Sequence, residues 1–181
     1  MGCWGITAFE SDAGLDTVGF IRRHLPKDGR LQLEKIVEAL KRDDWNAPSD
    51  VINGAAHTSP MALAEIIVKF LDQDQDSLDS GEICWDQNEK FRNISAFTAS
   101  RDSVLWVRTY LYDTLLNARE DAKNSEEYDR KWGGWFEKKD WINWQRLMKA
   151  LITRLDLLLA SAEDVIEIMS VKEQNQERVI R

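Results

Sequence analysis

The sequence contains little of what many enzymes and metal proteins depend on. It has two cysteines, Cys3 and Cys84, and two histidines, His24 and His57, in 181 residues. Two distant cysteines form neither a disulfide framework nor a paired zinc motif, which favours a reducing cytosol. The sequence has no H-E-x-x-H, G-x-S-x-G, P-loop or G-x-G-x-x-G motif, so it lacks the marks of zinc proteases, α/β-hydrolases and nucleotide-binding proteins. We therefore assign no catalytic residue, no metal ligand and no cofactor.

Clustered basic charge and long apolar runs are also scarce. Lys and Arg number 24 against 32 Asp and Glu, which gives a net charge of −8. The longest basic groupings are pairs such as Lys41-Arg42, which is followed by two aspartates. Because nucleic-acid binding needs clustered Lys and Arg, we expect none here. No run approaches the eighteen or so apolar residues of a spanning helix, and the basic and apolar regions of a secretion signal are missing. We expect a cytoplasmic protein without membrane contact.

The opening MGCWGITAFESDAGLD raises the alternative of a lipid anchor, because Gly and Cys follow the start Met. N-myristoylation wants Ser or Thr at position 6, where this chain has Ile6. A single acyl chain also needs a second signal such as a polybasic patch, whereas the charged residues that follow are acidic. We therefore expect the N-terminus to be part of the fold. Trp4 and Phe9 should be buried, and Gly2 and Gly5 should permit a tight backbone.

What the chain does have is apolar residues at helical spacing. Hydrophobic residues make up 43% and charged residues 31%, as in folded globular proteins. Positions three and four residues apart predict helices that begin near residues 12, 33, 59, 103 and 141, and no stretch of strict alternation stands out. The sequence therefore predicts an all-α fold of six to eight helices. These form a single compact domain over residues 1–181, with a frayed tail at 172–181.

Several of these helices carry signals at particular residues. Ser11 or Asp12 is a candidate N-cap for the first helix, and Ser59-Pro60 is typical of a cap followed by proline at the first helical position. A short helical turn is expected over VINGAAH. Ser161 and Asp164 resemble a capping box for a last helix that carries Val165, Ile168 and Met169. The most regular apolar seam consists of Trp141, Trp144, Met148, Leu151, Leu155 and Leu158.

The most unusual stretch is DQDQDSLDSGEICWD, which spans residues 72–86 and holds six carboxylates without any Lys or Arg. Its first three aspartates have the spacing of a calcium loop, but Ser77 stands where Gly is needed and Ile83 where a bidentate Glu should close the site. We therefore expect calcium affinity no better than about millimolar. The stretch is either a solvated loop or a docking surface for a basic partner. Its candidate partner-binding residues are Asp72, Asp74, Asp76, Asp79, Glu82 and Trp85.

Four tryptophans lie within KWGGWFEKKDWINW. Trp141 and Trp144 continue the apolar seam, so we expect both in the core. Trp132 and Trp135 flank the flexible Gly133-Gly134 pair. They are either turn residues or exposed positions of the kind that dominate binding energy.

The opening also carries a resemblance to a known family. The pattern M-G-x-W-G-x-x-x-F-x-x-D resembles the start of a family of small bacterial proteins of unknown function, and the similarity extends to about residue 72. The matching positions are Met1, Gly2, Trp4, Gly5, Phe9 and Asp12. The motif carries no chemistry, and members of the family look like accessory or immunity-type proteins. The resemblance implies a cytosolic bacterial protein whose N-terminus belongs to the fold.

The functional hypothesis follows from the acidity and from the missing catalytic motifs. We expect a non-enzymatic, cytosolic protein-binding protein, of the immunity type that neutralises a toxin or another basic partner. The alternative is an enzyme or metal-dependent protein whose carboxylates assemble only in the fold. The two differ in whether acidic residues converge in a concave pocket or spread over an open face.

Overall fold

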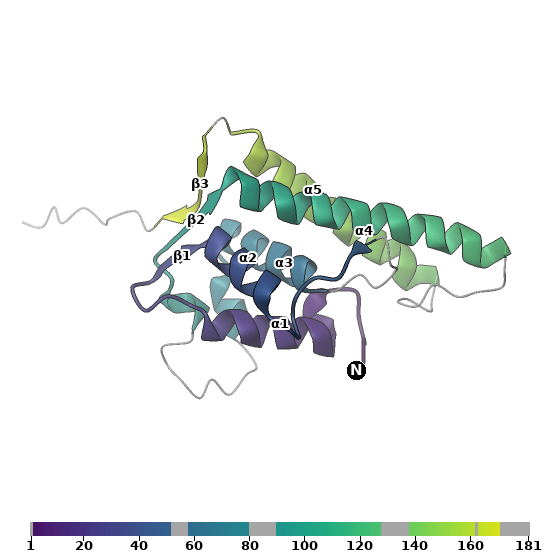
Figure 1. Cartoon of the computed structure of the whole chain (residues 1–181), viewed down its shortest axis with the longest axis horizontal. Coiled ribbons are helices and arrows are strands. Elements are labelled where there is room, and N and C mark those ends of the chain that lie inside the picture. The colour runs from purple at the N-terminus through teal and green to yellow at the C-terminus, as the bar shows by residue number, and fades with distance from the viewer. Residues whose placement is uncertain (1, 52–57, 80–89, 128–137, 162, 171–181) are drawn as a thin grey trace, which may run out of the picture.

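The computed structural model combines α-helices with a small sheet, and it describes residues 2–51, 58–79, 90–127, 138–161 and 163–170. Figure 1 shows α4 and α5 as a long pair along one edge of the molecule, and α3 packs against both of them and against α1. The elements, with η marking a 3-10 helix, are η1 (Ala8–Glu10), α1 (Asp12–Arg23), β1 (Arg30–Gln32), α2 (Leu33–Arg42), α3 (Ser59–Leu71), η3 (Gln75–Asp79), η4 (Phe91–Asn93), β2 (Ala96–Ser100), α4 (Arg101–Glu127), α5 (Lys138–Leu159) and β3 (Val165–Ser170).

The three-stranded sheet shows that the all-α prediction of six to eight helices is wrong. The strand order is β1-β2-β3, with β1 parallel and β3 antiparallel to β2. Alternate residues point into the core, namely Phe97 and Ala99 in β2 and Ile166 and Ile168 in β3. The fold is therefore mixed α/β. Its two-residue periodicity is confined to strands of three to six residues, which is too short to stand out against the helical pattern.

The segment after α5 continues into β3 and not into the predicted last helix. The Ser161 hydroxyl accepts a hydrogen bond from the backbone N–H two residues further on, at 3.2 Å, and caps no helix. The Arg101 backbone N–H donates to the Asp164 carbonyl at 2.9 Å, which ties the start of β3 to the start of α4. Val165 and Ile168 have helical spacing, yet they lie in a strand because β2 supplies backbone partners for it.

The other predicted helices are confirmed by the structure. Ser11 is the N-cap of α1, and its hydroxyl accepts from the Gly14 N–H at 3.1 Å. In α3 Pro60 lies in the first turn as expected, but the N-cap is Thr58 and not the predicted Ser59, which is the first residue of the helix. Trp144 of the α5 seam is buried, and Trp141 packs partly buried against the core. The turn expected over VINGAAH covers residues 51–57, of which 52–57 lie outside the described residues, as does the frayed tail expected over 172–181.

α3 is the centre of the core. Its buried residues surround the helix and do not form one stripe, as expected of a helix that is covered on all sides. The Phe70 ring meets the Phe97 ring of β2 edge to face, with the centroids 5.1 Å apart. The helices and the sheet therefore share one hydrophobic core. Within the described ranges, no helix has both the length and the apolar character needed to cross a membrane.

Candidate partner-binding surface

The N-terminal motif folds back and forms hydrogen bonds with the first turn of α1. The Gly2 N–H donates to Asp12 Oδ2 at 2.6 Å, and the Asp12 N–H donates back to the Gly2 carbonyl at 3.1 Å. The Trp4 N–H donates to the Glu10 carbonyl at 3.0 Å. A Cβ on Gly5 would lie 2.1 Å from Glu10 Cδ, so glycine is needed there for the carboxylate to fold back. The motif thus forms a closed loop that belongs to the fold.

Glu10 stabilises this loop from within. One of its carboxylate oxygens accepts from the backbone N–H groups of Ile6 and Thr7, at 3.0 and 3.1 Å, and from the Thr7 hydroxyl at 3.0 Å. These hydrogen bonds, with that of the Thr7 backbone foremost, hold the pKa of Glu10 below its usual value. The loop is therefore fixed mainly by polar contacts close in sequence.

The prediction that Trp4 is buried is wrong, because its side chain is 60% exposed. The motif is attached to the core by other residues. Ala8 is buried and its N–H donates to Glu65 Oε1 of α3 at 2.9 Å, while Phe9 packs partly buried against the core as expected. Trp4→Ala should therefore cost much less stability than the truncation of a core aromatic residue.

A second exposed tryptophan, Trp45, follows α2, and its side chain is 66% exposed. Asp43 fixes the backbone there, because its Oδ1 accepts from the N–H groups of Trp45 and Asn46 at 3.1 and 2.7 Å. These contacts, with that of Asn46 foremost, lower the pKa of Asp43. The indole Nε1 lies 3.4 Å from Asp16 Oδ2 on α1, which places Trp45 beside this helix.

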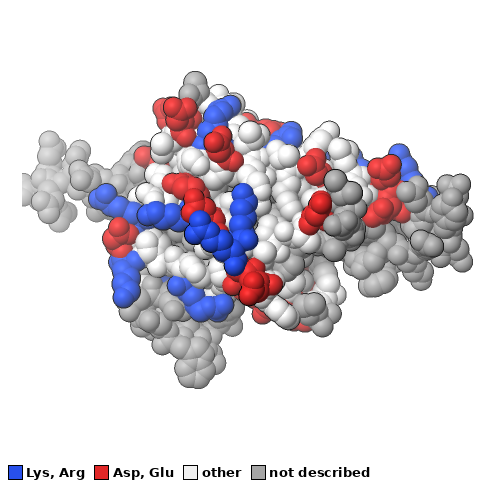
Figure 2. Space-filling view, viewed as in Figure 1, with Lys and Arg blue, Asp and Glu red and all other residues white. Residues whose placement is uncertain are grey.

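The two tryptophan segments therefore meet the same face of α1. Asp12 contacts the Gly2 end of one segment and Asp16 contacts Trp45, and the two aspartates are one helical turn apart. In Figure 1 both segments lie at the N-terminal end of α1, and Figure 2 shows acidic side chains gathered where α2 ends. We call this the tryptophan–aspartate surface; its exposed residues are Trp4, Asp12, Asp16, Asp44 and Trp45.

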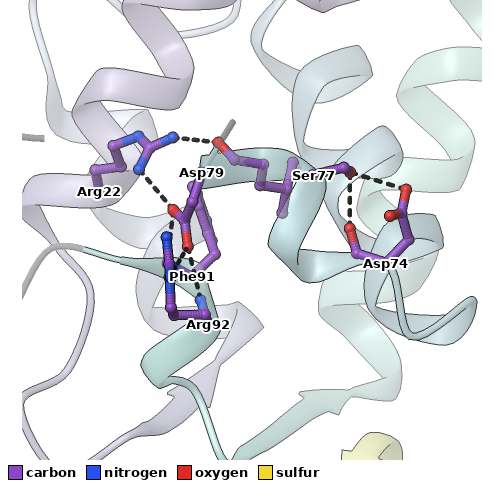
Figure 3. Close-up of polar contacts among 7 residues, drawn as sticks. Arg22, Asp74, Ser77, Asp79, Phe91 and Arg92 are labelled. Atoms are coloured by element: carbon purple, nitrogen blue, oxygen red, sulfur yellow. Dashed lines mark hydrogen bonds and ion pairs between the residues drawn. The ribbon is translucent and has the colours of Figure 1, made fainter. Parts of the chain in front are cut away.

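The acidic stretch, for which the sequence left a solvated loop and a docking surface as alternatives, is tied to the fold at Asp79. This carboxylate is buried and pairs with Arg22 of α1 at 2.8 Å, and it accepts from the N–H groups of Phe91 and Arg92 at 3.1 and 3.0 Å (Figure 3). The Arg22 guanidinium also donates to the Leu78 carbonyl and stacks 5.0 Å from the centre of the Phe91 ring. Asp79 therefore holds η3 and η4 against α1 from inside the protein.

Two more carboxylates of the stretch have cationic partners in other elements. Asp74 pairs with Lys69 of α3 at 3.0 Å, and its carboxylate accepts from the Ser77 hydroxyl at 2.8 Å. The hydrogen bond from Lys69, more than that from Ser77, lowers the pKa of Asp74. Asp72 pairs with Arg154 of α5 at 2.5 Å. The compensating charge that is missing from the local sequence thus comes from α1, α3 and α5.

The remaining predicted site residues divide into two groups. Asp76 is exposed on η3, and its role as a partner-binding residue stays a prediction, as do the roles of Asp72 and Asp74. The other predicted positions lie outside the described residues, and these are Glu82, Trp85, Trp132 and Trp135. Sequence reasoning missed Trp45, Asp16 and Asp44. A signal was available in Asp-Asp-Trp-Asn directly after a helix end, where an Asp side chain can organise a turn.

The described residues offer few of the elements of a catalytic or metal site. Among them, no three His, Cys, Asp or Glu side chains lie close enough together to hold a metal ion. His24 is at the C-cap of α1, where its Nδ1 lies 2.9 Å from the Phe20 carbonyl and its ring stacks on the Phe20 ring. An open cavity of about 360 Å³ between α4 and α5 is lined by Arg119, Ala122, Lys123, Trp141 and Gln145. None of these described lining residues is a carboxylate.

These features define a mixed α/β protein whose two most exposed described aromatic residues are Trp4 and Trp45, with the Trp45 indole beside the surface carboxylate of Asp16. No family model, no curated protein and no solved structure matches the chain. The resemblance of the opening motif to a bacterial family therefore stays a prediction.

Proposed function

We propose that this is a non-enzymatic protein-binding protein of the cytosol, whose partner presents basic side chains. The observation that carries the proposal is the pair Trp4 and Trp45, which are mostly exposed and lie on backbone segments fixed by hydrogen bonds. A role in neutralising a toxin or another basic protein is consistent with this chemistry.

The surface has the composition of a binding site for Lys and Arg. Tryptophan is enriched among the residues that dominate interface energies, and its ring face attracts cations within about 6 Å of its centre. Within this chain, Lys41 lies 4.4 Å from the centre of the Trp106 ring, an intramolecular example of the same contact. Exposed carboxylates beside the rings add attraction at longer range. The fixed backbone also reduces the entropy lost when the side chains are covered.

The proposal is tested by affinity capture from a lysate with three forms of the protein. The first is the wild type and the second is the double variant Trp4→Ala/Trp45→Ala. The third, Leu157→Ala, is a matched control because Leu157 on α5 is also 66% exposed but lies away from this surface. We expect a basic protein that is captured by the wild type and by the control and lost from the double variant. Equal capture by the double variant would reject the proposal.

A further inference from the structure

The cavity between α4 and α5 has no part in the proposed function. Its volume of about 360 Å³ lies near the lower end of the range for small-molecule sites. α4 contributes Arg119, Ala122 and Lys123 to the described lining, and α5 contributes Trp141 and Gln145. The cavity therefore has the size for a small molecule, and its described lining combines two cations, an amide and an aromatic ring.

The described lining is positively charged, although the whole protein has a net charge of −8. Arg119 and Lys123 are one helical turn apart on α4, so both side chains can reach the same ligand. Glu120 and Asp121 lie between them in the sequence, but residues one and two positions further on belong to other sides of a helix. Neither is among the described lining residues. An anion that enters the cavity thus meets two positive charges there.

Arg119 is held in one orientation by α5. Its Nε donates to Gln145 Oε1 at 2.8 Å, and the Gln145 amide nitrogen donates to the Trp141 carbonyl at 3.5 Å. Within the part of the chain that the structure describes, the terminal nitrogens of Arg119 and the Lys123 ammonium have no hydrogen-bond or ion-pair partner. Arg108, earlier on α4, is by contrast paired with a carboxylate of α5. The terminal nitrogens of a guanidinium form a fork that matches the oxygens of a carboxylate or a phosphate.

Trp141 adds an aromatic wall to the cavity. Its ring stacks on the ring of the buried Trp144, with the centroids 5.4 Å apart and the planes at 20°, so the indole is supported from the core. The part of the ring that borders the cavity offers apolar contact to a flat group. Two cations alone attract any small anion, whereas a ring beside them favours an anion that carries a flat apolar group.

We propose that this cavity is a binding site for small organic anions in which a carboxylate or phosphate group is joined to a flat ring. Arg119 and Lys123 contact the acid group, and Trp141 packs against the ring. A phosphate monoester carries a charge of about −1.5 to −2 at neutral pH, which matches two cations better than a singly charged carboxylate does. This site is separate from the tryptophan–aspartate surface and independent of its role.

Isothermal titration calorimetry with three simple probes tests the site. Phenyl phosphate has the ring and the higher charge, benzoate has the ring with a single charge, and inorganic phosphate has the charge without the ring. We expect saturable one-to-one binding of phenyl phosphate, weaker binding of benzoate and the weakest binding of inorganic phosphate. Saturable binding of either ring-bearing probe supports the site, and the tighter of the two identifies the acid group. If neither ring-bearing probe binds saturably, or if inorganic phosphate binds as tightly as both, the proposal is wrong.

Variants test whether the two cations hold the probe. Lys123→Gln should weaken phenyl phosphate binding about tenfold through the loss of a hydrogen bond to a charged group. Arg119→Lys should weaken it by a similar factor, because the charge remains but the fork is lost. Arg42→Gln removes the same charge from an exposed position on α2 and is the matched control, with affinity equal to that of the wild type.

Circular dichroism verifies that each variant is folded. Wild-type affinity in both Lys123→Gln and Arg119→Lys, or an equal loss in Arg42→Gln, would overturn the assignment of the site to this cavity. The Trp4→Ala/Trp45→Ala variant should bind the probes as the wild type does. Failure of the proposed function would therefore leave this result unaffected.

Discussion

Glu65 places a carboxylate among the buried, mostly apolar residues of α3. Its side chain is buried, and the hydrogen bond from the Ala8 N–H is its link to the N-terminal loop. Burial raises the pKa of Glu65 to about 7; Glu10 adds to the rise, and the Ala8 hydrogen bond and Lys69 oppose it. The unfolded chain therefore releases this proton before the folded protein does. The contribution of Glu65 to stability is therefore most favourable below its ordinary pKa of 4.5, and it becomes less favourable as the pH rises to about 7, where the buried carboxylate is charged in the folded protein too.

Glu65→Gln should remove this pH dependence. The amide oxygen can still accept from the Ala8 N–H, while the charge that burial disfavours is gone. From the size of the pKa rise, the wild type should lose roughly 2–3 kcal/mol more stability than the variant between pH 5 and pH 8. Urea unfolding at the two pH values measures the difference, with the exposed Glu38→Gln as control. Parallel pH profiles for wild type and Glu65→Gln would contradict this account.

Two glycines of α1 should respond in opposite ways to the same substitution. A Cβ on Gly14 would lie 1.7 Å from the Ala8 carbonyl oxygen, whereas on Gly19 the nearest atom would be Arg23 Nη1 at 3.6 Å. Gly14→Ala should destabilise the protein by about 1–3 kcal/mol because the backbone of the N-terminal loop must move. Gly19→Ala should be neutral or stabilise by up to about 1 kcal/mol through helix propensity. Thermal unfolding of both variants tests this contrast. An equal shift of the melting temperature in both would show that the N-terminal loop does not pack closely against α1 at Gly14.

At the scale of elements, the ion pair between Arg22 and Asp79 ties two short 3-10 helices to α1. Asp79 also accepts two backbone hydrogen bonds, so its buried carboxylate is bound by groups of the same chain. Asp79 is therefore a structural residue of the fold, unlike Asp74 and Asp76 of the same stretch, whose side chains are exposed. A buried ion pair adds little net stability by itself, but removing one partner leaves a buried charge behind.

Asp79→Asn should destabilise the protein by about 3–5 kcal/mol, because the buried Arg22 guanidinium loses the charge of the Asp79 carboxylate. Asp74→Asn is the matched control from the same stretch. Its ion pair with Lys69 is at the surface, so the unfolding midpoint should remain close to that of the wild type. Chemical denaturation of the two variants measures the contrast. If both lowered the midpoint equally, burial of Asp79 would not be what holds this stretch.

The sequence predicted the helices better than the strands, for a physical reason. The α5 seam repeats over five turns, so a helix is the regular structure that buries Trp144 and Leu155 together. In β3, by contrast, Val165 and Ile168 have helical spacing, and only the two buried residues Ile166 and Ile168 show the two-residue period of a strand. The choice depends on β2, more than sixty residues away, which no local pattern reveals. The same limit applies to Asp79, whose partner Arg22 lies 57 residues away.

At the scale of the whole molecule, the carboxylates behind the net charge of −8 differ in how strongly they can attract a partner. Asp72, Asp74 and Asp79 form ion pairs with cations of the same chain. Asp16 and Asp44 instead lie exposed, Asp16 in contact with the Trp45 indole and Asp44 next to Trp45 in the sequence. Long-range attraction toward a basic partner should therefore be centred on the tryptophan–aspartate surface, where ring faces and carboxylates act together.

This distribution predicts which neutral variants slow association. Asp16→Asn/Asp44→Asn should lower the association rate of the captured basic partner several-fold at low salt, because exposed charges at an interface act mainly on the on-rate. The effect should fade as salt shortens the screening length to about 8 Å near physiological ionic strength. Asp72→Asn/Asp74→Asn removes the same formal charge from ion-paired positions and should change the rate less. Stopped-flow mixing of each variant with the partner at two salt concentrations provides the comparison. If the Asp72/Asp74 variant proved the slower one, docking would lie on the acidic stretch after α3 and not on the surface that presents Trp4 and Trp45.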